Sequence, residues 1–81
     1  MKNNIAILGS TGSIGKTLIN IIKKNKKNFQ IVLLSSNKNH KDLLKQAYFF
    51  NVKNLIITDR NSFNILKNKK LKKKINIYNN F

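Results

Sequence analysis

The segment GSTGSIGKT, from Gly9 to Thr17, constrains the fold of this chain more than any other feature of the sequence. It directly follows the apolar run Asn4–Leu8, and a helical pattern begins within it. The three glycines, at positions 9, 12 and 15, are the only glycines among the 81 residues. A glycine-rich turn between a strand and a helix is typical of phosphate binding, because it brings backbone amides and a helix N-terminus close to the anion.

Two phosphate-binding motifs compete for this segment. A Walker A loop, G-x-x-x-x-G-K-[ST], would use Gly15, Lys16 and Thr17, but its first glycine would have to stand where Ser10 is found. Such a loop must present consecutive amides and aim its lysine at the phosphates, and one extra residue disturbs both. The bulky Ile14 would also project into the loop. The spacing therefore argues against a nucleotide triphosphatase.

A dinucleotide-binding turn fits the spacing better. Gly9 permits a tight turn after the strand, Gly12 lets the backbone approach a pyrophosphate, and Gly15 lets the helix pack closely on the sheet. The motif is a variant of G-x-G-x-x-G in which Ser10 replaces the usual first glycine. Hydroxyl donors near the anion are expected from Ser10, Thr11 and Ser13. The alternative that stays open is an ordinary strand–turn–helix connection whose glycines serve packing alone.

Strand and helix patterns alternate along the rest of the chain. Short apolar or β-branched runs predict strands at Asn4–Leu8, Gln30–Ser36, Asn54–Asp59 and Ile75–Tyr78. Helical spacing predicts helices at Ser13–Asn25, His40–Phe50 and Ser62–Lys70. In the first helix the apolar residues Ile14, Leu18, Ile21 and Ile22 fall at helical spacing, with Lys23 and Lys24 outside. The second helix is expected to bury Leu43, Leu44, Ala47 and Phe50.

This alternation implies right-handed βαβ crossovers and a mainly parallel sheet. The fold class predicted is therefore α/β, a Rossmann-like parallel sheet with flanking helices. A full dinucleotide fold has six strands, and only the first βαβαβ half fits here. We expect residues 1–81 to be the N-terminal nucleotide-binding segment of a longer enzyme.

The formal net charge of +15, from 17 basic and 2 acidic residues, suggests nucleic acid or an anionic membrane as a partner. Every basic residue except Arg60 is lysine, however, and Lys, Asn, Ile and Phe are the residues of A/T-rich codons. The densest patch, Lys67–Lys74, contains no aromatic or arginine side chain for stacking or base readout. We expect a solvated surface that binds neither nucleic acid nor membrane, and a small basic nucleic-acid-binding module remains the alternative.

The composition gives little support for a secreted protein, a membrane-spanning protein or a thiolate metal site. The chain contains no cysteine, which excludes a disulfide framework and thiolate metal ligands. No apolar run approaches the roughly 20 residues of a membrane span. The first strand follows Met1 so closely that no signal peptide is expected, and a cytoplasmic location is the expectation.

The end of the second predicted strand indicates which nucleotide is bound. NAD-binding folds usually carry a carboxylate there to bond the ribose hydroxyls. The segment Ser35–His40 has none and instead offers the donors Ser36, Asn37 and Asn39 and the cation Lys38. These groups favour the 2′-phosphate of NADP. Asn39 also fits a helix N-cap, and His40 is expected to be exposed in the first turn.

The stretches ILGSTGSIG (Ile7–Gly15) and FQIVLLSSNKNH (Phe29–His40) resemble the start of the 1-deoxy-D-xylulose 5-phosphate reductoisomerase family. That family uses NADPH and a divalent cation, Mg or Mn, to convert this phosphosugar to 2-C-methyl-D-erythritol 4-phosphate in non-mevalonate isoprenoid biosynthesis. The resemblance implies that residues 11–14 contact the pyrophosphate and nicotinamide side of NADPH. It implies that residues 37–39 approach the 2′-phosphate. The predicted cofactor-binding residues are Gly9, Ser10, Thr11, Gly12, Ser13, Ile14, Gly15, Ser36, Asn37, Lys38 and Asn39.

The resemblance also implies limits. Asn37 stands where the family usually has glycine, and asparagine is the least costly substitute if that position needs a positive φ. The acidic metal ligands and the catalytic residues belong to domains absent from this chain, whose only acidic residues are Asp42 and Asp59. The chain alone is thus expected to be inactive, with no catalytic or metal-binding residue.

A full-length member of the family is expected to be a homodimer that takes its phosphosugar substrate through the missing domains. The alternatives are the N-terminal part of another NADP enzyme, of the semialdehyde dehydrogenase or epimerase type, and a truncated gene product.

Overall fold

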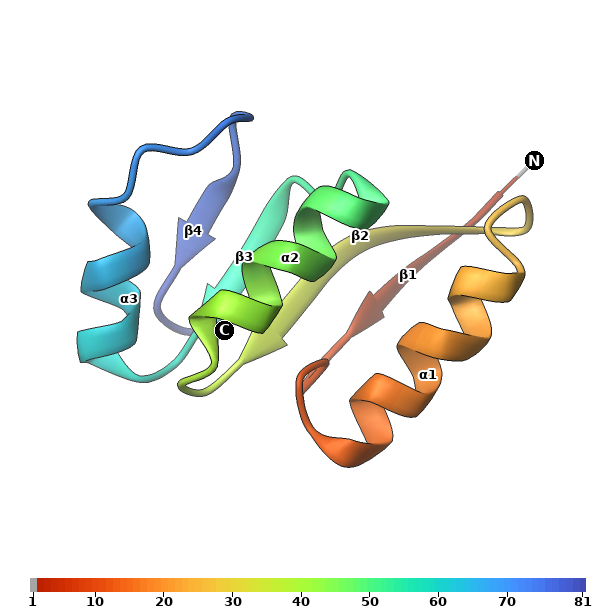
Figure 1. Ribbon diagram of the computed structural model, residues 1–81, viewed down its shortest axis with the longest axis horizontal. Coiled ribbons are helices and arrows are strands. Elements are labelled where there is room, and N and C mark those ends of the chain that lie inside the picture. The colour runs from red at the N-terminus through yellow and green to blue at the C-terminus, as the bar shows by residue number, and fades with distance from the viewer. Residues whose placement is uncertain (1) are drawn as a thin grey trace.

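The computed structural model describes residues 2–81 and contains one four-stranded sheet with three helices (Figure 1). The strands are β1 (Asn3–Ile7), β2 (Phe29–Ser36), β3 (Asn54–Ile57) and β4 (Asn76–Tyr78). The helices are α1 (Ser13–Lys24), α2 (His40–Phe50) and α3 (Arg60–Lys67). Every element predicted from the sequence is therefore present, with ends that differ by a few residues.

Within the described residues, no helix has the length and apolarity needed to cross a membrane.

The sheet has the order β1-β2-β3-β4, and each pair of neighbours is parallel. Each strand pairs with the next one along the chain, so all three crossovers run in the same direction. Right-handed crossovers of this kind place their helices on one face of the sheet, as Figure 1 shows. The α/β, Rossmann-like fold class predicted from the sequence is confirmed.

The core lies between this helical layer and the sheet. The fully buried leucines Leu34, Leu43, Leu55 and Leu66 come from β2, α2, β3 and α3 in turn. Helix α2 packs over β2 and β3 at the centre of the layer (Figure 1). It buries Leu43, Leu44 and Ala47 as predicted, while Phe50 is half-buried. The helices and strands thus share one apolar interior, which fixes where each loop emerges.

The buried face of α1 differs from the apolar pattern in its sequence. Of the four apolar residues that the helical spacing singled out, only Ile22 is buried, and it is joined by Gly15 and Ile19. Ile14, which the resemblance to the family assigned to cofactor binding, is 81% exposed. The two stripes, 14–18–21 and 15–19–22, have the same helical spacing, so periodicity could not choose between them. The close approach of Gly15 to the preceding loop selects the second stripe.

Parallel pairing brings the carboxyl ends of the strands to one edge of the sheet. The loop after β1 therefore lies beside the segment that follows β2, because β1 and β2 are neighbours with Ile7 opposite Leu34. The link from β3 to α3, which contains Thr58 and Asp59, lies next along the same edge. In open parallel sheets, ligands bind at this edge.

Candidate dinucleotide-binding site

The three glycines of the loop lack a side chain for three different reasons. Gly9 has φ of +68°, a left-handed conformation that residues with a Cβ rarely adopt. A Cβ there would meet no atom within 4 Å, so the backbone turn, and not crowding, requires glycine. This agrees with the tight turn predicted after the first strand.

Gly15 is needed for close packing. A Cβ at this position would lie 2.1 Å from the carbonyl oxygen of Gly9 and 2.6 Å from the Cα of Ser10. Both obstacles are backbone atoms, which cannot move aside by changing rotamer. The first turn of α1 therefore rests directly against the loop, as the spacing predicted.

Gly12 is different, because nothing within the fold requires it to be glycine. Its φ of −81° and ψ of 177° are open to any residue. A Cβ would meet only the carbonyl oxygen of Gly9, at 3.5 Å, which is an ordinary contact. The missing side chain therefore leaves room on the exposed side of the loop, where a ligand could approach the backbone.

The backbone beside Gly12 offers amides to such a ligand. Gly12 is the N-cap of α1, and no side chain caps this helix. Within residues 2–81, the loop hydrogen bonds engage the amides of Gly9, Ser10, Gly12 and Lys16 but not those of Ser13 and Ile14. Both residues are exposed. Uncapped amides at a helix N-terminus carry partial positive charge and favour an anion.

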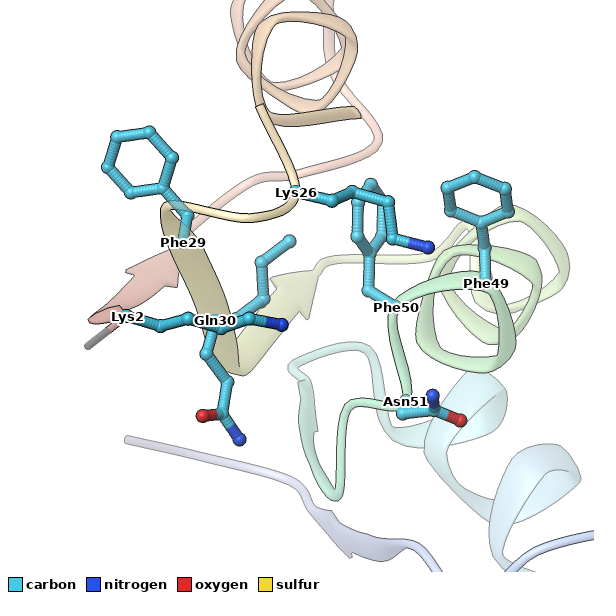
Figure 2. Close-up of a pocket in the computed structure, with 8 residues that line it drawn as sticks. Lys2, Lys26, Phe29, Gln30, Phe49, Phe50 and Asn51 are labelled. Atoms are coloured by element: carbon cyan, nitrogen blue, oxygen red, sulfur yellow. The ribbon is translucent and has the colours of Figure 1, made fainter. Parts of the chain in front are cut away.

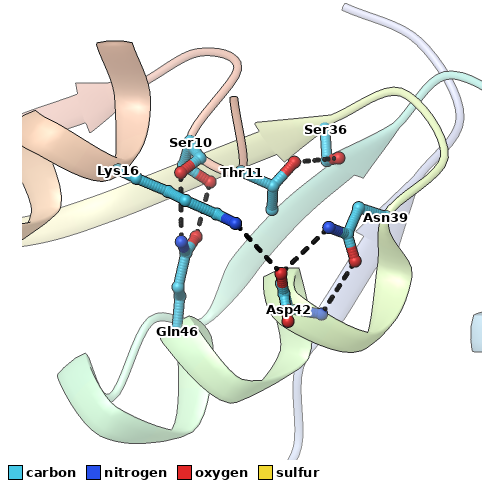
Figure 3. A network of polar contacts seen from close by, with 7 residues as sticks. All are labelled: Ser10, Thr11, Lys16, Ser36, Asn39, Asp42 and Gln46. Atoms are coloured by element: carbon cyan, nitrogen blue, oxygen red, sulfur yellow. Dashed lines mark hydrogen bonds and ion pairs between the residues drawn. The ribbon is translucent and has the colours of Figure 1, made fainter. Parts of the chain in front are cut away.

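A second wall of the site comes from the end of β2. A cleft of about 400 Å³ is lined by Gly9, Thr11, Gly12, Ser36, Asn37, Lys38 and Asn39. The hydroxyls of Thr11 and Ser36 lie 2.7 Å apart and join the two walls, although the residues are 25 positions apart in sequence (Figure 3). Seven of the eleven predicted residues thus line one cleft. Ser13 and Ile14 lie beside it at the start of α1, while Ser10 and Gly15 are buried beneath the loop.

Ser10 differs from its predicted role as a hydroxyl donor to the anion. The residue is fully buried. Its hydroxyl donates to Oε1 of Gln46 at 2.7 Å, and its amide donates to the carbonyl oxygen of Ser35 at 2.9 Å. These contacts direct Ser10 into the protein, so it supports the loop and does not face the cleft.

Asn37 is unstrained, because Asn51 is the only non-glycine residue among those described that has a positive φ. A positive φ is thus not the reason for asparagine at position 37. Its Oδ1 accepts a hydrogen bond from the Thr58 hydroxyl at 2.8 Å, and its carbonyl oxygen accepts one from the Asp59 amide at 3.0 Å. These bonds fasten the segment that carries the exposed Lys38 to the end of β3.

Asn39 caps α2, as predicted. Its Oδ1 accepts from the Asp42 amide at 3.1 Å, and its Nδ2 donates to the Asp42 carboxylate at 3.0 Å (Figure 3). That hydrogen bond, followed by the nearby Lys16 and Lys45, lowers the pKa of Asp42. The Asp42 carboxylate belongs to α2, and the Lys16 ammonium lies 3.5 Å from it. This pairing of Lys16 agrees with the argument against a Walker A loop.

His40 is half-buried, contrary to the expectation of exposure. Its buried Nδ1 has no hydrogen-bond partner among the described residues.

The acidic residues have structural partners. Asp59 caps α3 by accepting hydrogen bonds from the amide and hydroxyl of Ser62 at 3.0 and 2.9 Å. These bonds, and then the charge of Lys38, lower the pKa of Asp59. Nowhere in residues 2–81 do three His, Asp or Glu residues gather in a metal-binding arrangement. The residues present therefore do not fit a divalent cation.

A separate cavity of about 310 Å³ lies at the opposite edge of the sheet, where β1 and β2 begin and α2 ends (Figure 2). Among its lining residues, the Lys26 ammonium lies 4.6 Å from the centre of the Phe49 ring. The Lys23 ammonium lies 4.8 Å from the same centre. Its lining includes the last residues of α2 and a residue just after α1, but no first-turn residue of a described helix. The glycine cleft is therefore the better candidate for a nucleotide site.

Comparison with known proteins identifies the family. The sequence model of 1-deoxy-D-xylulose 5-phosphate reductoisomerase matches residues 5–80. The chain belongs to this reductoisomerase family. The result favours it over the semialdehyde dehydrogenase and epimerase families, which share the glycine spacing.

Individual members of the reductoisomerase family support the match. The enzyme of Pelagibacter ubique is 57% identical over 81 residues, which cover 95% of this chain and 20% of that protein. The enzyme of Zymomonas mobilis is 38% identical over 63 residues, covering 78% of this chain and 16% of that protein. The chain thus spans about a fifth of the length of its curated reductoisomerase relatives.

Solved reductoisomerase structures share the fold. The Zymomonas mobilis enzyme in complex with NADPH superposes with a TM-score of 0.88 at 31% identity, over 96% of this chain and 21% of that one. A second reductoisomerase, in complex with magnesium, gives a TM-score of 0.82 at 25% identity, over 96% of this chain and 20% of that one.

Proposed function

We propose that this chain is the NADPH-binding segment of a 1-deoxy-D-xylulose 5-phosphate reductoisomerase. The observation that carries the proposal concerns Gly12, a position where the fold itself does not require glycine. The amides of the neighbouring Ser13 and Ile14 make no hydrogen bond within residues 2–81. Membership of the reductoisomerase family and the likeness to an NADPH complex indicate that the ligand is NADPH. A pyrophosphate is the anion that a turn of this kind accepts.

Each wall of the cleft would hold one part of the cofactor. The amides of Ser13 and Ile14 and the open space over Gly12 suit the pyrophosphate. Lys38, with Asn37 and Asn39 on either side, suits the 2′-phosphate, since an ammonium and amide donors favour a dianion. The 2′-phosphate is also the reason to expect NADPH to bind more tightly than NADH.

NADPH, when bound, supplies a hydride for reduction of the rearranged sugar phosphate. The residues of this chain bind and orient the cofactor so that its nicotinamide reaches a neighbouring domain. We propose that those further domains of the full-length enzyme hold the phosphosugar, the divalent cation and the catalytic groups. By itself the chain should not turn over substrate, and we expect the full-length enzyme to be a homodimer.

A calorimetric titration of the purified 81-residue chain with NADPH and with NADH tests the proposal. Circular dichroism first establishes that the protein is folded. We expect NADPH to bind measurably and more tightly than NADH, and Gly12→Val to remove binding because its side chain occupies the space of the phosphate. Folded protein that binds neither coenzyme would refute the proposal. Metal-dependent NADPH oxidation by the chain with the phosphosugar would refute its inactivity.

A further inference from the structure

A side chain outside the cleft holds the loop from below. Gln46 lies in the middle of α2 and directs both ends of its amide at one loop residue, Ser10 (Figure 3). Its Oε1 accepts from the Ser10 hydroxyl at 2.7 Å, and its Nε2 donates to the Ser10 carbonyl oxygen at 3.0 Å. The carbonyl can only accept, which fixes which end of the amide faces it. The two residues are 36 positions apart, so the contact exists only in the folded protein.

The loop needs such a restraint because of its composition. Ser10 and Thr11 lie between two glycines, and glycine loses more backbone freedom on folding than any other residue. Ser10 is held on one side by β2, through its amide bond to the Ser35 carbonyl at 2.9 Å. Gln46 holds it on the other side, from α2. The two elements together fix Ser10, and with it the backbone that leads to Gly12.

We propose that Gln46 is a positioning residue for the cofactor loop. It does not line the cleft. It holds Ser10 so that the backbone from Thr11 to Ile14 has its binding conformation before NADPH arrives. A preorganised loop does not spend binding free energy on being ordered, so the restraint raises cofactor affinity. This inference rests on the proposed NADPH-binding function.

The test compares Gln46→Met with the parent chain. Methionine keeps the length and flexibility of the side chain but removes both hydrogen bonds to Ser10. We expect the Kd for NADPH to rise about tenfold, as the loss of one to two ordinary hydrogen bonds predicts. The matched control is Gln30→Leu. Gln30 is exposed and lies at the start of β2, whereas the cofactor cleft lies at the other end of this strand, so the Kd should stay unchanged.

Amide hydrogen exchange without cofactor supplies an independent readout. Gln46→Met should speed exchange at the amides of Ser10 and Gly12 but not at that of Asp59, on the same edge of the sheet. A residue that only supported overall stability would change all three alike. A double-mutant cycle adds specificity, because Gln46→Met should cost less affinity in the Ser10→Ala background than in the parent.

An unchanged Kd for NADPH, or unchanged exchange at the Ser10 and Gly12 amides, would overturn the proposal. If Gln46→Met does not fold, Gln46→Glu is measured in the same way. That variant keeps the acceptor for the Ser10 hydroxyl but loses the donor to the carbonyl oxygen. If the parent chain does not bind NADPH, the proposed function fails, whereas the exchange data still decide whether Gln46 orders the loop.

Discussion

Replacing Gly15 with alanine should destabilise the fold, and replacing Gly12 with alanine should not. In Gly15→Ala the new methyl would lie 2.1 Å from the Gly9 carbonyl oxygen, more than an ångström closer than ordinary contact allows. Helix α1 or the loop must then shift. Overpacking typically costs about 1–3 kcal/mol, and a backbone obstacle places this case at the upper end of that range. The better helix propensity of alanine recovers about 1 kcal/mol.

The net loss expected for Gly15→Ala is therefore about 2 kcal/mol, a large part of the roughly 4–12 kcal/mol available to a domain of this size. It should lower the Tm by roughly 8–16 °C. Gly12→Ala should change the free energy of unfolding by only about 0.5 kcal/mol, because its backbone conformation suits alanine and its Cβ makes an ordinary contact.

Thermal and urea unfolding of the two variants, followed by circular dichroism, measure these changes. The same samples are then titrated with NADPH. Gly12→Ala should keep its stability and bind the cofactor more weakly, whereas Gly15→Ala should first lose stability. If Gly12→Ala unfolds as readily as Gly15→Ala, Gly12 serves packing, and the argument for a ligand at this loop is wrong.

Three further predictions concern single positions. Lys38→Glu should raise the Kd for NADPH at least about tenfold and that for NADH far less; equal losses would show that Lys38 does not contact the 2′-phosphate. Ile22→Ala should cost about 2–4 kcal/mol in urea unfolding and the neighbouring Ile21→Ala less than about 1 kcal/mol, since only Ile22 is buried; similar costs would contradict the orientation of α1. The pKa of Asp59 is lowered in the folded state, so its stabilising effect is complete above its usual value of 3.8 and is lost as pH falls below it. Asp59→Asn keeps a cap without a titrating charge and should therefore show a weaker acid dependence of stability; an identical pH profile would contradict the role of the charge.

The sequence predicted those parts of the fold that local patterns specify. Alternating strands and helices required parallel crossovers, and the glycine spacing located the turn after β1. The buried face of α2 was also predictable, because Leu43, Leu44 and Ala47 form its one strongly apolar stripe. Local pattern was sufficient in these cases because each residue's environment depends mainly on its own element.

Elsewhere the sequence left equivalent choices that only packing resolved. Helix α1 carries two apolar stripes with the same spacing, and the contact between Gly15 and the loop selected the one that contains Ile22. The role of Gln46 was not predicted. The only local signal was a polar residue next to Ala47 on the buried side of α2, and such a signal does not say which distant group the side chain reaches.

The sequence by itself determined that a glycine-rich turn joins the first strand and helix, because glycines at that spacing suit a tight turn and close packing. Tertiary structure alone decided which of the three glycines the fold itself requires. A Cβ at Gly15 would collide with backbone, the φ of Gly9 is left-handed, and Gly12 has neither constraint. The physical reason is that steric demand depends on the distance to neighbouring atoms, and pairing of β1 with β2 and docking of α2 set those distances.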